Sequence, residues 1–335
     1  MSDTNMKAIW ASGYGNHEVL QLKKVPIPQI KDNEALINVR ASVATTADTM
    51  MLSGRPWFSR LFTGLRKPKH AIPGTGFSGE VVAVGQQVKS FQTGDEVFGE
   101  TTLGLGANAE FIAIPEESVM MHKPNTMSHP EAATLCDGPL TSLNFLMNLG
   151  RIKSGQRVLI NGASGSLGTA AVQLAKHFGA EVTGICSKTN MGWVKSLGAD
   201  TVVDYQNEDY TKLSKSYHII FDTVGKSSFN QVKHLLVKKG LYLSPVLRPS
   251  LIFQMLITSL TGGKKAKFDA TGLKPHAELK QMLSELVEIF NAGKLKIVLD
   301  RQFPLEKVAK AHAYISNGHK KGNVVIIVES ENKES

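Results

Sequence analysis

The spacing of hydrophobic residues changes its period near residue 130. Before this point, short segments alternate apolar and polar residues and are broken by Gly, Pro and Asn, which is typical of short strands joined by turns. The clearest of these segments are residues 34–40, 79–85 and 109–114. Beyond residue 130, apolar strand candidates alternate with segments of helical period. We therefore expect an α/β protein, with a small barrel-like β domain followed by a doubly wound parallel sheet.

A helix start marks the change of period. Ser128 precedes the helical segment and Glu131 follows three residues later, which is the pattern of a capping box. The strands expected after this helix are residues 157–161, 181–186, 199–205, 217–222 and 240–244. The remaining elements expected are helices over 169–178 and 277–292, and a final β–α–β tail at 297–299, 304–317 and 322–328.

One stretch, residues 245–270, departs from this alternation. It is first apolar, at residues 251–257, and then basic and glycine-containing. So many apolar residues would leave a large patch on a free surface loop. Four interpretations stay open at this point: a core helix, a cover over a substrate pocket, a contact with a second subunit, or a contact with a membrane surface.

A glycine-rich turn joins the strand at 157–161 to the helix that follows it. Glycines allow the backbone to approach a pyrophosphate closely, and the free N–H groups and the positive end of the helix dipole hold its charge. Small residues in the helix, Ala170, Ala171 and Ala175, permit close packing on a sheet. The pattern predicts a dinucleotide site with a cradle formed by Gly162, Ala163, Ser164, Gly165, Ser166, Leu167 and Gly168.

The end of the next strand indicates which dinucleotide binds. An NAD site has Asp or Glu about 20 residues beyond the turn, where the carboxylate accepts hydrogen bonds from the ribose. Here Ser187 and Lys188 occupy that place. A hydroxyl and an ammonium group suit a 2′-phosphate, which a carboxylate would repel. The predicted cofactor is NADPH; the alternative is that Lys188 is an ordinary surface lysine.

Composition and charge narrow the remaining classes of function. The 335 residues are 42% hydrophobic, which is enough for two cored domains, and the two cysteines have no pairing or metal-binding spacing. The net charge of +9 comes from scattered lysines and arginines, so it favours a solvated surface and attraction of an anionic cofactor over nucleic-acid binding. Peripheral membrane contact is the less favoured alternative. We expect a cytoplasmic protein, since neither a secretory signal nor a membrane span is visible.

The whole arrangement resembles the medium-chain dehydrogenase/reductase family. The residues that carry this resemblance are 71–81, 94–99, 132–135 with Thr141, 162–168, 197–200, 221–225 and 320–325. The resemblance implies a GroES-like β-barrel catalytic domain, made of residues 1–127 and 297–335, and a Rossmann NADP-binding domain at 128–296. It also implies that cofactor and substrate meet in a cleft between the two domains.

The positions that hold zinc in part of that family carry other residues here. Thr45 and Thr46 stand at the first ligand site, and Thr75 and Gly76 at the second. Because zinc needs three Cys, His or carboxylate ligands, no metal site is expected. The chain therefore looks like the zinc-independent branch, whose NADPH-dependent members reduce quinones and α,β-unsaturated carbonyls. Alternatives are a zinc-free alcohol or aldehyde reductase, or an NADPH-binding sensor or crystallin-like protein with vestigial catalysis.

The resemblance also implies roles for individual residues. It places Asp48 and Thr141 beside the nicotinamide as catalytic residues. The alternatives are that Asp48 orders its own loop and that Thr141 contributes only to helix packing. Further cofactor contacts are expected from Thr45, Ser187, Lys188, Tyr205, Val224, Gly225, Lys321 and Asn323. The loop that follows Asp48 is expected to supply the wall of the substrate pocket through Arg55, Trp57 and Phe58. The resemblance also implies a homodimer, joined through the edge strand near residues 240–246. Residues 251–267 are expected to flank the cleft and to be mobile without ligand.

Overall fold

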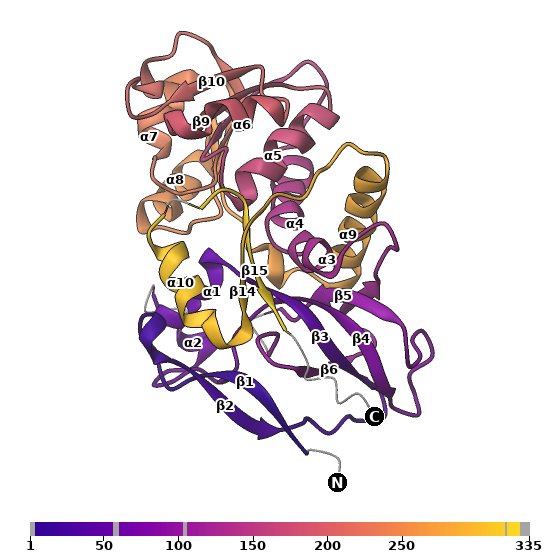
Figure 1. The fold of residues 1–335 in the computed structure, drawn as a ribbon. Coiled ribbons are helices and arrows are strands. Elements are labelled where there is room, and N and C mark those ends of the chain that lie inside the picture. The colour runs from indigo at the N-terminus through magenta and orange to yellow at the C-terminus, as the bar shows by residue number, and fades with distance from the viewer. Residues whose placement is uncertain (1–3, 56–59, 103–105, 319, 329–335) are drawn as a thin grey trace. The chain divides into compact units, whose positions relative to one another are not determined.

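The computed structural model describes residues 4–55, 60–102, 106–318 and 320–328 (Figure 1). The chain forms two compact units. Unit 1 consists of residues 1–137, 272–283 and 299–335, and unit 2 of residues 138–271 and 284–298. Helix α3 (His129–Leu135) belongs to unit 1 because Ala133 packs against Val43 and Val325 of the β domain. The unit therefore extends beyond the predicted boundary at residue 128.

Unit 1 is β-rich, as its alternating pattern predicts. Its seven-stranded sheet has the order β14-β15-β3-β4-β5-β7, with β6 paired to β3, and a separate hairpin joins β1 to β2. Figure 1 shows β14 and β15, from the end of the chain, beside β3 from its beginning. The strands are β1 (Asn5–Ala11), β2 (Leu20–Pro26), β3 (Glu34–Ala44), β4 (Gly76–Val84), β5 (Glu96–Glu100), β6 (Phe111–Pro115), β7 (Val119–His122), β14 (Leu299–Pro304) and β15 (Asn323–Ile327).

Apolar side chains on the inner faces of these strands form the core of unit 1. Ile37, Phe77, Val97 and Ile326 are fully buried in it. In β3, buried residues alternate with half-buried ones from Ala35 to Ala41, which is the period that identified this strand in the sequence. The helices that accompany them are α1 (Thr46–Ser53), α2 (Arg60–Thr63), α3 and α10 (Val308–Ser316). The predicted strand at 297–299 begins only at Leu299 and continues to Pro304, where a helix was expected to start.

Unit 2 contains a six-stranded parallel sheet in the order β10-β9-β8-β11-β12-β13. The chain runs outward from β8 in one direction and then, from β11, in the other, so β8 and β11 flank a topological switch point where ligands commonly bind. The doubly wound sheet predicted from the sequence is confirmed. The strands are β8 (Arg157–Asn161), β9 (Glu181–Cys186), β10 (Thr201–Asp204), β11 (Tyr217–Asp222), β12 (Leu236–Leu243) and β13 (Lys265–Lys267).

Helices cover this sheet. They are α4 (Gly138–Leu143), α5 (Ser166–His177), α6 (Met191–Ser196), α7 (Phe229–Val232) and α8 (Pro249–Ser259), while α9 (His276–Asn291) contributes residues to both units. Helix α5 begins three residues before the predicted start at Thr169, because Gly165 is already extended and serves as its N-cap. Phe145 and Phe221 stack in the core with ring centroids 5.1 Å apart.

The structure of residues 245–270 contradicts the predicted position of the sheet edge. It folds into α8 and the short strand β13, which pairs in parallel with β12. Strand β12 is therefore bonded on both sides, to β11 and to β13, and it is not the edge of the sheet. The predicted dimer contact near residues 240–246 was wrong in this respect, because β13 already uses the backbone groups of β12.

Candidate functional site

The glycine-rich turn of unit 2 has the geometry of a phosphate cradle. Gly162 has φ +81°, and a Cβ there would lie 2.6 Å from Thr223 Oγ1. A Cβ at Gly168 would lie 2.1 Å from the carbonyl oxygen of Gly162, so only glycine allows α5 to approach the strand this closely. At Gly165, by contrast, the nearest atom to a Cβ would be 3.5 Å away, which leaves the mouth of the turn open.

Helix α5 supplies the electrostatic part of the cradle. Its N-cap residue is Gly165, which makes no side-chain cap hydrogen bond. The N–H groups of the first turn, at Ser166, Leu167 and Gly168, therefore point out of the helix with the positive end of its dipole. A pyrophosphate fits this combination of open backbone and helix N-terminus. The predicted cradle thus has the geometry that a dinucleotide requires.

The side chain of Asn190, which no sequence pattern identified, links the turn after β9 to the cradle. Asn190 Nδ2 donates to Ser164 Oγ at 3.2 Å and to Ser187 Oγ at 3.1 Å. It therefore joins the cradle to the place where Ser187 and Lys188 replace the acidic residue. Asn190 Oδ1 is buried and has no partner among the described residues. A lone Asn in a turn carries no sequence signal, so only the fold identifies it.

The side chains predicted to select the cofactor lie at the ends of two neighbouring strands. Lys188 follows β9 and is exposed, and Tyr205 follows β10 and is half exposed. The Tyr205 N–H donates to the Cys186 carbonyl at 3.2 Å, which brings the two strand ends together. The structure thus gathers Ser187, Lys188 and Tyr205 at one corner of the sheet.

The turn after β11 forms the opposite wall of the cradle. Val224 is exposed, and a Cβ on Gly162 would lie 2.7 Å from Val224 Cγ1. Asp222 holds the turn by accepting hydrogen bonds from the Gly225 N–H and from Asn161 Nδ2, at 3.0 and 2.9 Å. Val224 is therefore in contact with Gly162 of the cradle, and Gly225 is the next residue of the same turn.

Thr141 lies on α4, which packs on the start of α5. The neighbouring Ser142 Oγ donates to the Leu167 carbonyl at 2.8 Å. A Cβ on Gly138 would lie 2.5 Å from Ser166 Oγ, so the helix is close against the cradle. Thr141 itself is half-buried. Its place next to the first turn of α5 agrees with a position near the cofactor, although no contact of its own defines that role.

In unit 1, Thr45 and Asp48 form the capping box that begins α1. Thr45 donates to Asp48 Oδ2 from its backbone N–H at 3.0 Å and from its hydroxyl at 2.9 Å. The Asp48 N–H donates back to Thr45 Oγ1 at 2.9 Å. The second carboxyl oxygen, Asp48 Oδ1, is buried and has no partner among the described residues. The helix cap uses only Asp48 Oδ2, so Oδ1 is available for a contact with a ligand.

Burial and neighbouring charges perturb the groups around Asp48. Burial raises the pKa of Asp48 to about 7, opposed by the hydrogen bonds from Thr45 and supported by the negative charge of Asp137. Desolvation likewise raises the pKa of Glu100 to about 8. Burial lowers the pKa of Lys320, against the attraction of Asp137 and Asp48. Asp48, Glu100 and Lys320 thus form a cluster of desolvated ionisable groups, which is typical of sites where protons are transferred.

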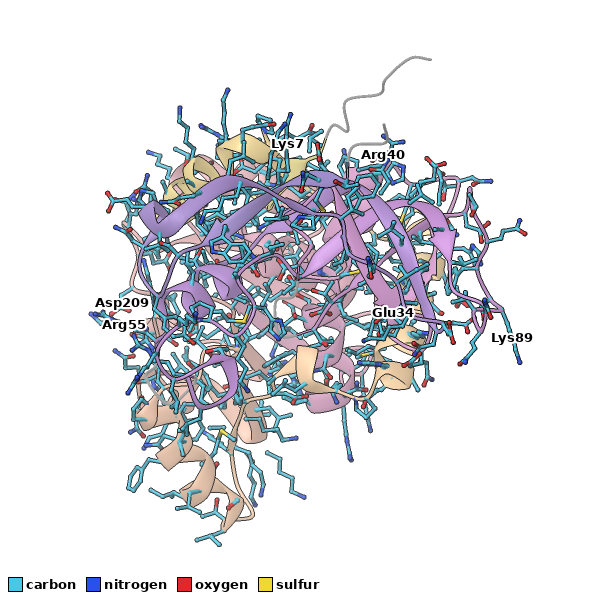
Figure 2. All side chains as sticks on the ribbon, turned by 90° about the horizontal axis from the view of Figure 1, so that it is seen from below. Lys7, Glu34, Arg40, Arg55, Lys89 and Asp209 are labelled. Carbon is cyan, nitrogen blue, oxygen red and sulfur yellow. The ribbon has the colours of Figure 1, made fainter. Side chains whose placement is uncertain are left out.

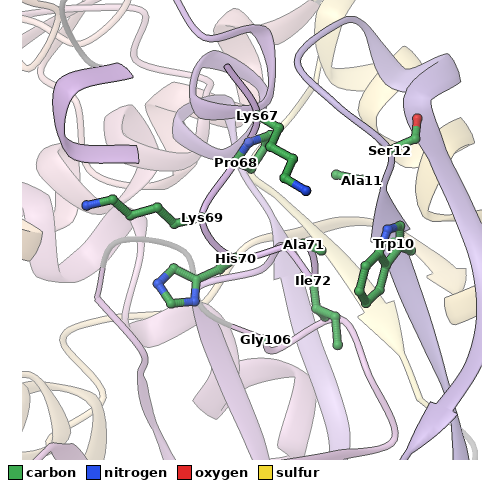
Figure 3. A pocket seen from close by; sticks show the side chains of 10 residues that line it. All are labelled: Trp10, Ala11, Ser12, Lys67, Pro68, Lys69, His70, Ala71, Ile72 and Gly106. Carbon is green, nitrogen blue, oxygen red and sulfur yellow. The ribbon is translucent and has the colours of Figure 1, made fainter. Parts of the chain in front are cut away.

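A cavity of about 170 Å³ opens beside Asp48 within unit 1. Its apolar lining comes from Met51, Leu52, Pro68 and Pro73, and its polar lining from Asp48, Tyr14, Thr63, Lys69 and His70. A larger groove of about 500 Å³ lies across the 67–70 segment and contains Trp10 (Figure 3). We take the smaller cavity as the candidate substrate site, because it alone of the two contains a predicted site residue and a buried oxygen without a partner.

Of the residues predicted to line the substrate pocket, the structure describes only Arg55. Arg55 follows α1, is exposed, and lines neither the cavity nor the groove. It lies at the surface in Figure 2. Trp57 and Phe58 lie outside the described residues. Their contribution to a pocket stays a prediction.

The final strand brings the last predicted cofactor residues close to Thr45. Val324 of β15 pairs with Ala44 of β3, so Asn323 and Thr45 adjoin at the same end of this antiparallel pair. Asn323 is buried, and the Lys321 N–H donates to Asp300 Oδ2 at 2.8 Å. The tail therefore borders the region that contains Asp48. Thr45, Lys321 and Asn323 belong to unit 1, whereas the cradle belongs to unit 2.

The chemistry of the donor groups does not suit zinc. Within the described ranges, no three His, Cys, Asp or Glu side chains are grouped so that they could hold a metal ion. Both cysteines, Cys136 and Cys186, are buried, and burial raises the pKa of each thiol, which disfavours a thiolate ligand.

Known proteins resemble this chain over nearly its full length. Residues 31–125 match the alcohol dehydrogenase GroES-like domain, and residues 197–326 match a domain described as zinc-binding dehydrogenase. The chloroplastic quinone-oxidoreductase QR1 of Triphysaria versicolor is 32% identical, over 97% of this chain and 99% of its own length. A chloroplastic NADPH-dependent alkenal/one oxidoreductase of Arabidopsis thaliana is 30% identical, over 96% of this chain and 79% of its own.

The fold comparison agrees with these matches. The structure of the quinone oxidoreductase from Coxiella burnetii superposes with a TM-score of 0.86 at 28% identity, and the match covers 97% of this chain and 100% of that one. This chain combines a GroES-like domain with a Rossmann-like parallel sheet. The chain belongs to the medium-chain dehydrogenase/reductase family, in its quinone oxidoreductase-like branch.

Proposed function

We propose that this protein is an NADPH-dependent oxidoreductase that reduces quinones or α,β-unsaturated carbonyl compounds without zinc. The observation that carries the proposal is the glycine cradle at the β8–β11 switch point, with Ser187 and Lys188 where an NAD site has a carboxylate. Relatives described as a quinone oxidoreductase and as an NADPH-dependent alkenal/one oxidoreductase support the same chemistry.

The residues present indicate how the cofactor would bind and which substrates the site suits. NADPH supplies a hydride when bound. The cradle and the Lys188 corner would hold its phosphates, and α4, which carries Thr141, packs against the first turn of α5. Quinones and enones delocalise the charge that arrives with the hydride, so they need less electrophilic help than a simple ketone. A donor set without three metal ligands therefore suits this substrate class better than simple alcohols.

Asp48 is the group best placed to assist the substrate oxygen. Thr45 occupies Oδ2, and the unpartnered Oδ1 belongs to a side chain that lines the cavity. With its pKa raised to about 7, the Asp48 carboxyl group is largely protonated below neutral pH. It can then donate a hydrogen bond from Oδ1 to a carbonyl oxygen on which negative charge develops. Asp48 thus has a second role besides capping α1.

The assembly and location of the protein remain predictions. A homodimer is expected from the family resemblance, and the strand available at the sheet edge is β13 rather than β12. The cytoplasm is expected from the sequence, although the relatives described above are chloroplastic. Small-molecule quinones or enones remain the proposed substrates, with no nucleic-acid partner.

Turnover with NADPH tests the proposed reaction. We expect quinones and enones to be reduced with kcat/KM at least about tenfold higher than saturated ketones and aldehydes, because only conjugated substrates delocalise the incoming charge. NADPH consumption over a substrate panel measures this. Preference for saturated aldehydes would indicate the zinc-free alcohol or aldehyde reductase instead. Tight NADPH binding without any turnover would indicate a binding protein with vestigial catalysis.

The purified protein should contain no stoichiometric zinc. Thr45, Thr46, Thr75 and Gly76 provide no ligand where related zinc enzymes hold their metal. We expect metal analysis to find less than about one zinc per ten chains, and quinone reduction to change by less than about twofold in a chelator. One zinc per chain, lost together with activity on chelation, would contradict the proposal.

NADPH should bind at least about tenfold more tightly than NADH, since one charge-assisted hydrogen bond to the 2′-phosphate contributes about 1.5–3 kcal/mol. Lys188→Ala should remove most of this preference without weakening NADH binding. Lys195→Ala, which changes an exposed lysine on α6, is the matched control and should leave the ratio unchanged. Fluorescence titration with both cofactors measures the ratio, and equal affinities in the unmodified protein would overturn the assignment.

The activity should fall as pH rises through about 7, because Asp48 donates only in its protonated form. Asp48→Asn keeps a donor at all pH values, so we expect kcat/KM within about threefold of the unmodified enzyme at pH 6 and no fall above pH 7. Glu100→Gln removes the other raised carboxyl group and should leave the fall in place. A fall that persists in Asp48→Asn would show that another group is responsible.

A further inference from the structure

Helix α8 exposes an apolar face that nothing in the described structure covers. Its inner side packs through Leu251, Met255 and Thr258, and Thr258 Oγ1 accepts a hydrogen bond from the Ala266 N–H of β13 at 3.2 Å. The outer residues follow helical spacing, so they form one stripe. This apolar stripe consists of Ile252, Phe253, Leu256, Ile257 and Leu260.

The exposure of the apolar stripe is large for a surface helix. Phe253 is 59% exposed, Leu256 63% and Leu260 84%. No residue of α8 from Pro249 to Ser259 carries a charge, so its exposed face has no charged group that would favour water. An exposed patch of this kind marks an interaction surface.

The segment of the chain that contains the stripe carries only positive charge. From Thr223 to Phe268 the chain contains no Asp or Glu, and its eight basic residues are Lys226, Lys233, Lys238, Lys239, Arg248, Lys264, Lys265 and Lys267. Arg248 is the N-cap of α8, and Lys264 and Lys265 follow its C-terminal turn. Lys264 Nζ donates to the Lys233 carbonyl at 2.7 Å, which brings Lys233 to the same end. Cations therefore stand at both ends of the apolar stripe.

We propose that α8 binds the surface of a bilayer that contains anionic phospholipids, with the apolar stripe inserted at the level of the acyl chains and the basic residues on the headgroups. Apolar residues flanked by lysine and arginine are the composition that such interfacial helices use. A contact between two copies through the same stripe is the alternative occupant, and it would appear as a change of oligomeric state when the stripe is altered.

The helix lies on the membrane and does not cross it. Its 11 residues span about 16 Å, roughly half of the hydrocarbon thickness of a bilayer. No helix within the part of the chain that the structure describes is long and apolar enough to span a membrane. Binding should therefore be reversible and should weaken as salt screens the headgroup attraction.

Vesicle co-sedimentation of the full chain tests the proposal. We expect binding to vesicles of 70% phosphatidylcholine and 30% phosphatidylglycerol, weaker binding at high salt, and little binding to pure phosphatidylcholine. Phe253→Ser/Leu256→Ser should weaken binding at least about tenfold, and Lys264→Gln/Lys265→Gln about fivefold for each charge removed. The matched controls are Leu22→Ser/Leu273→Ser and Lys24→Gln/Lys89→Gln, which change exposed residues of unit 1 and should bind as the unmodified protein does.

Two further measurements separate this proposal from the alternatives. NADPH affinity should be unchanged in all four variants, so the result does not depend on the proposed reaction. Light scattering reports the oligomeric state. If Phe253→Ser/Leu256→Ser broke an oligomer while the unmodified protein ignored anionic vesicles, the stripe would be a contact between copies and the proposal would be overturned. Equal binding to neutral and anionic vesicles, or equal loss in the control variants, would also overturn it.

Discussion

The buried carboxylate of Asp222 holds together the carboxyl ends of β8, β11 and β12, and the cradle is built at this end of the parallel sheet. It accepts hydrogen bonds at 2.9–3.0 Å from Asn161 Nδ2, the N–H groups of Gly225 and Ser227, and the Tyr242 hydroxyl. A buried carboxylate without partners is very costly, so all four donors must be held in place together. The ends of β8, β11 and β12 are thereby joined, and the turns that flank the cradle are set before a cofactor binds.

The two units create opposite electrostatic environments. Around the cradle, N–H groups, the dipole of α5 and Lys188 favour an anion. In unit 1, desolvation raises the pKa of Asp48 and Glu100, so protonated carboxyl groups persist close to neutral pH. The first environment suits the phosphates of a dinucleotide and the second suits a substrate that gains negative charge. Each environment arises from the local fold of its own unit.

Much of the fold follows from local pattern, and the exceptions have physical causes. The strands at 157–161, 181–186 and 217–222 were predicted with their observed bounds, because short segments with apolar centres between turn residues are typical of buried parallel strands. The capping box at Ser128 is also confirmed. Strand β13 was not predicted, since Lys265-Ala266-Lys267 has no strand pattern of its own and pairs only because β12 offers an open side.

The sequence by itself determined the glycine cradle and the class of cofactor, because those features depend on neighbouring residues along one strand, turn and helix. Only the tertiary structure showed that Asn190 joins Ser164 to Ser187, that Asp48 retains an oxygen without a partner, and that α8 turns its apolar stripe outward. Burial, the pKa of a carboxyl group and the exposure of a helix face all depend on which distant residues pack against them. The spacing of residues along the sequence does not show which distant residues pack together.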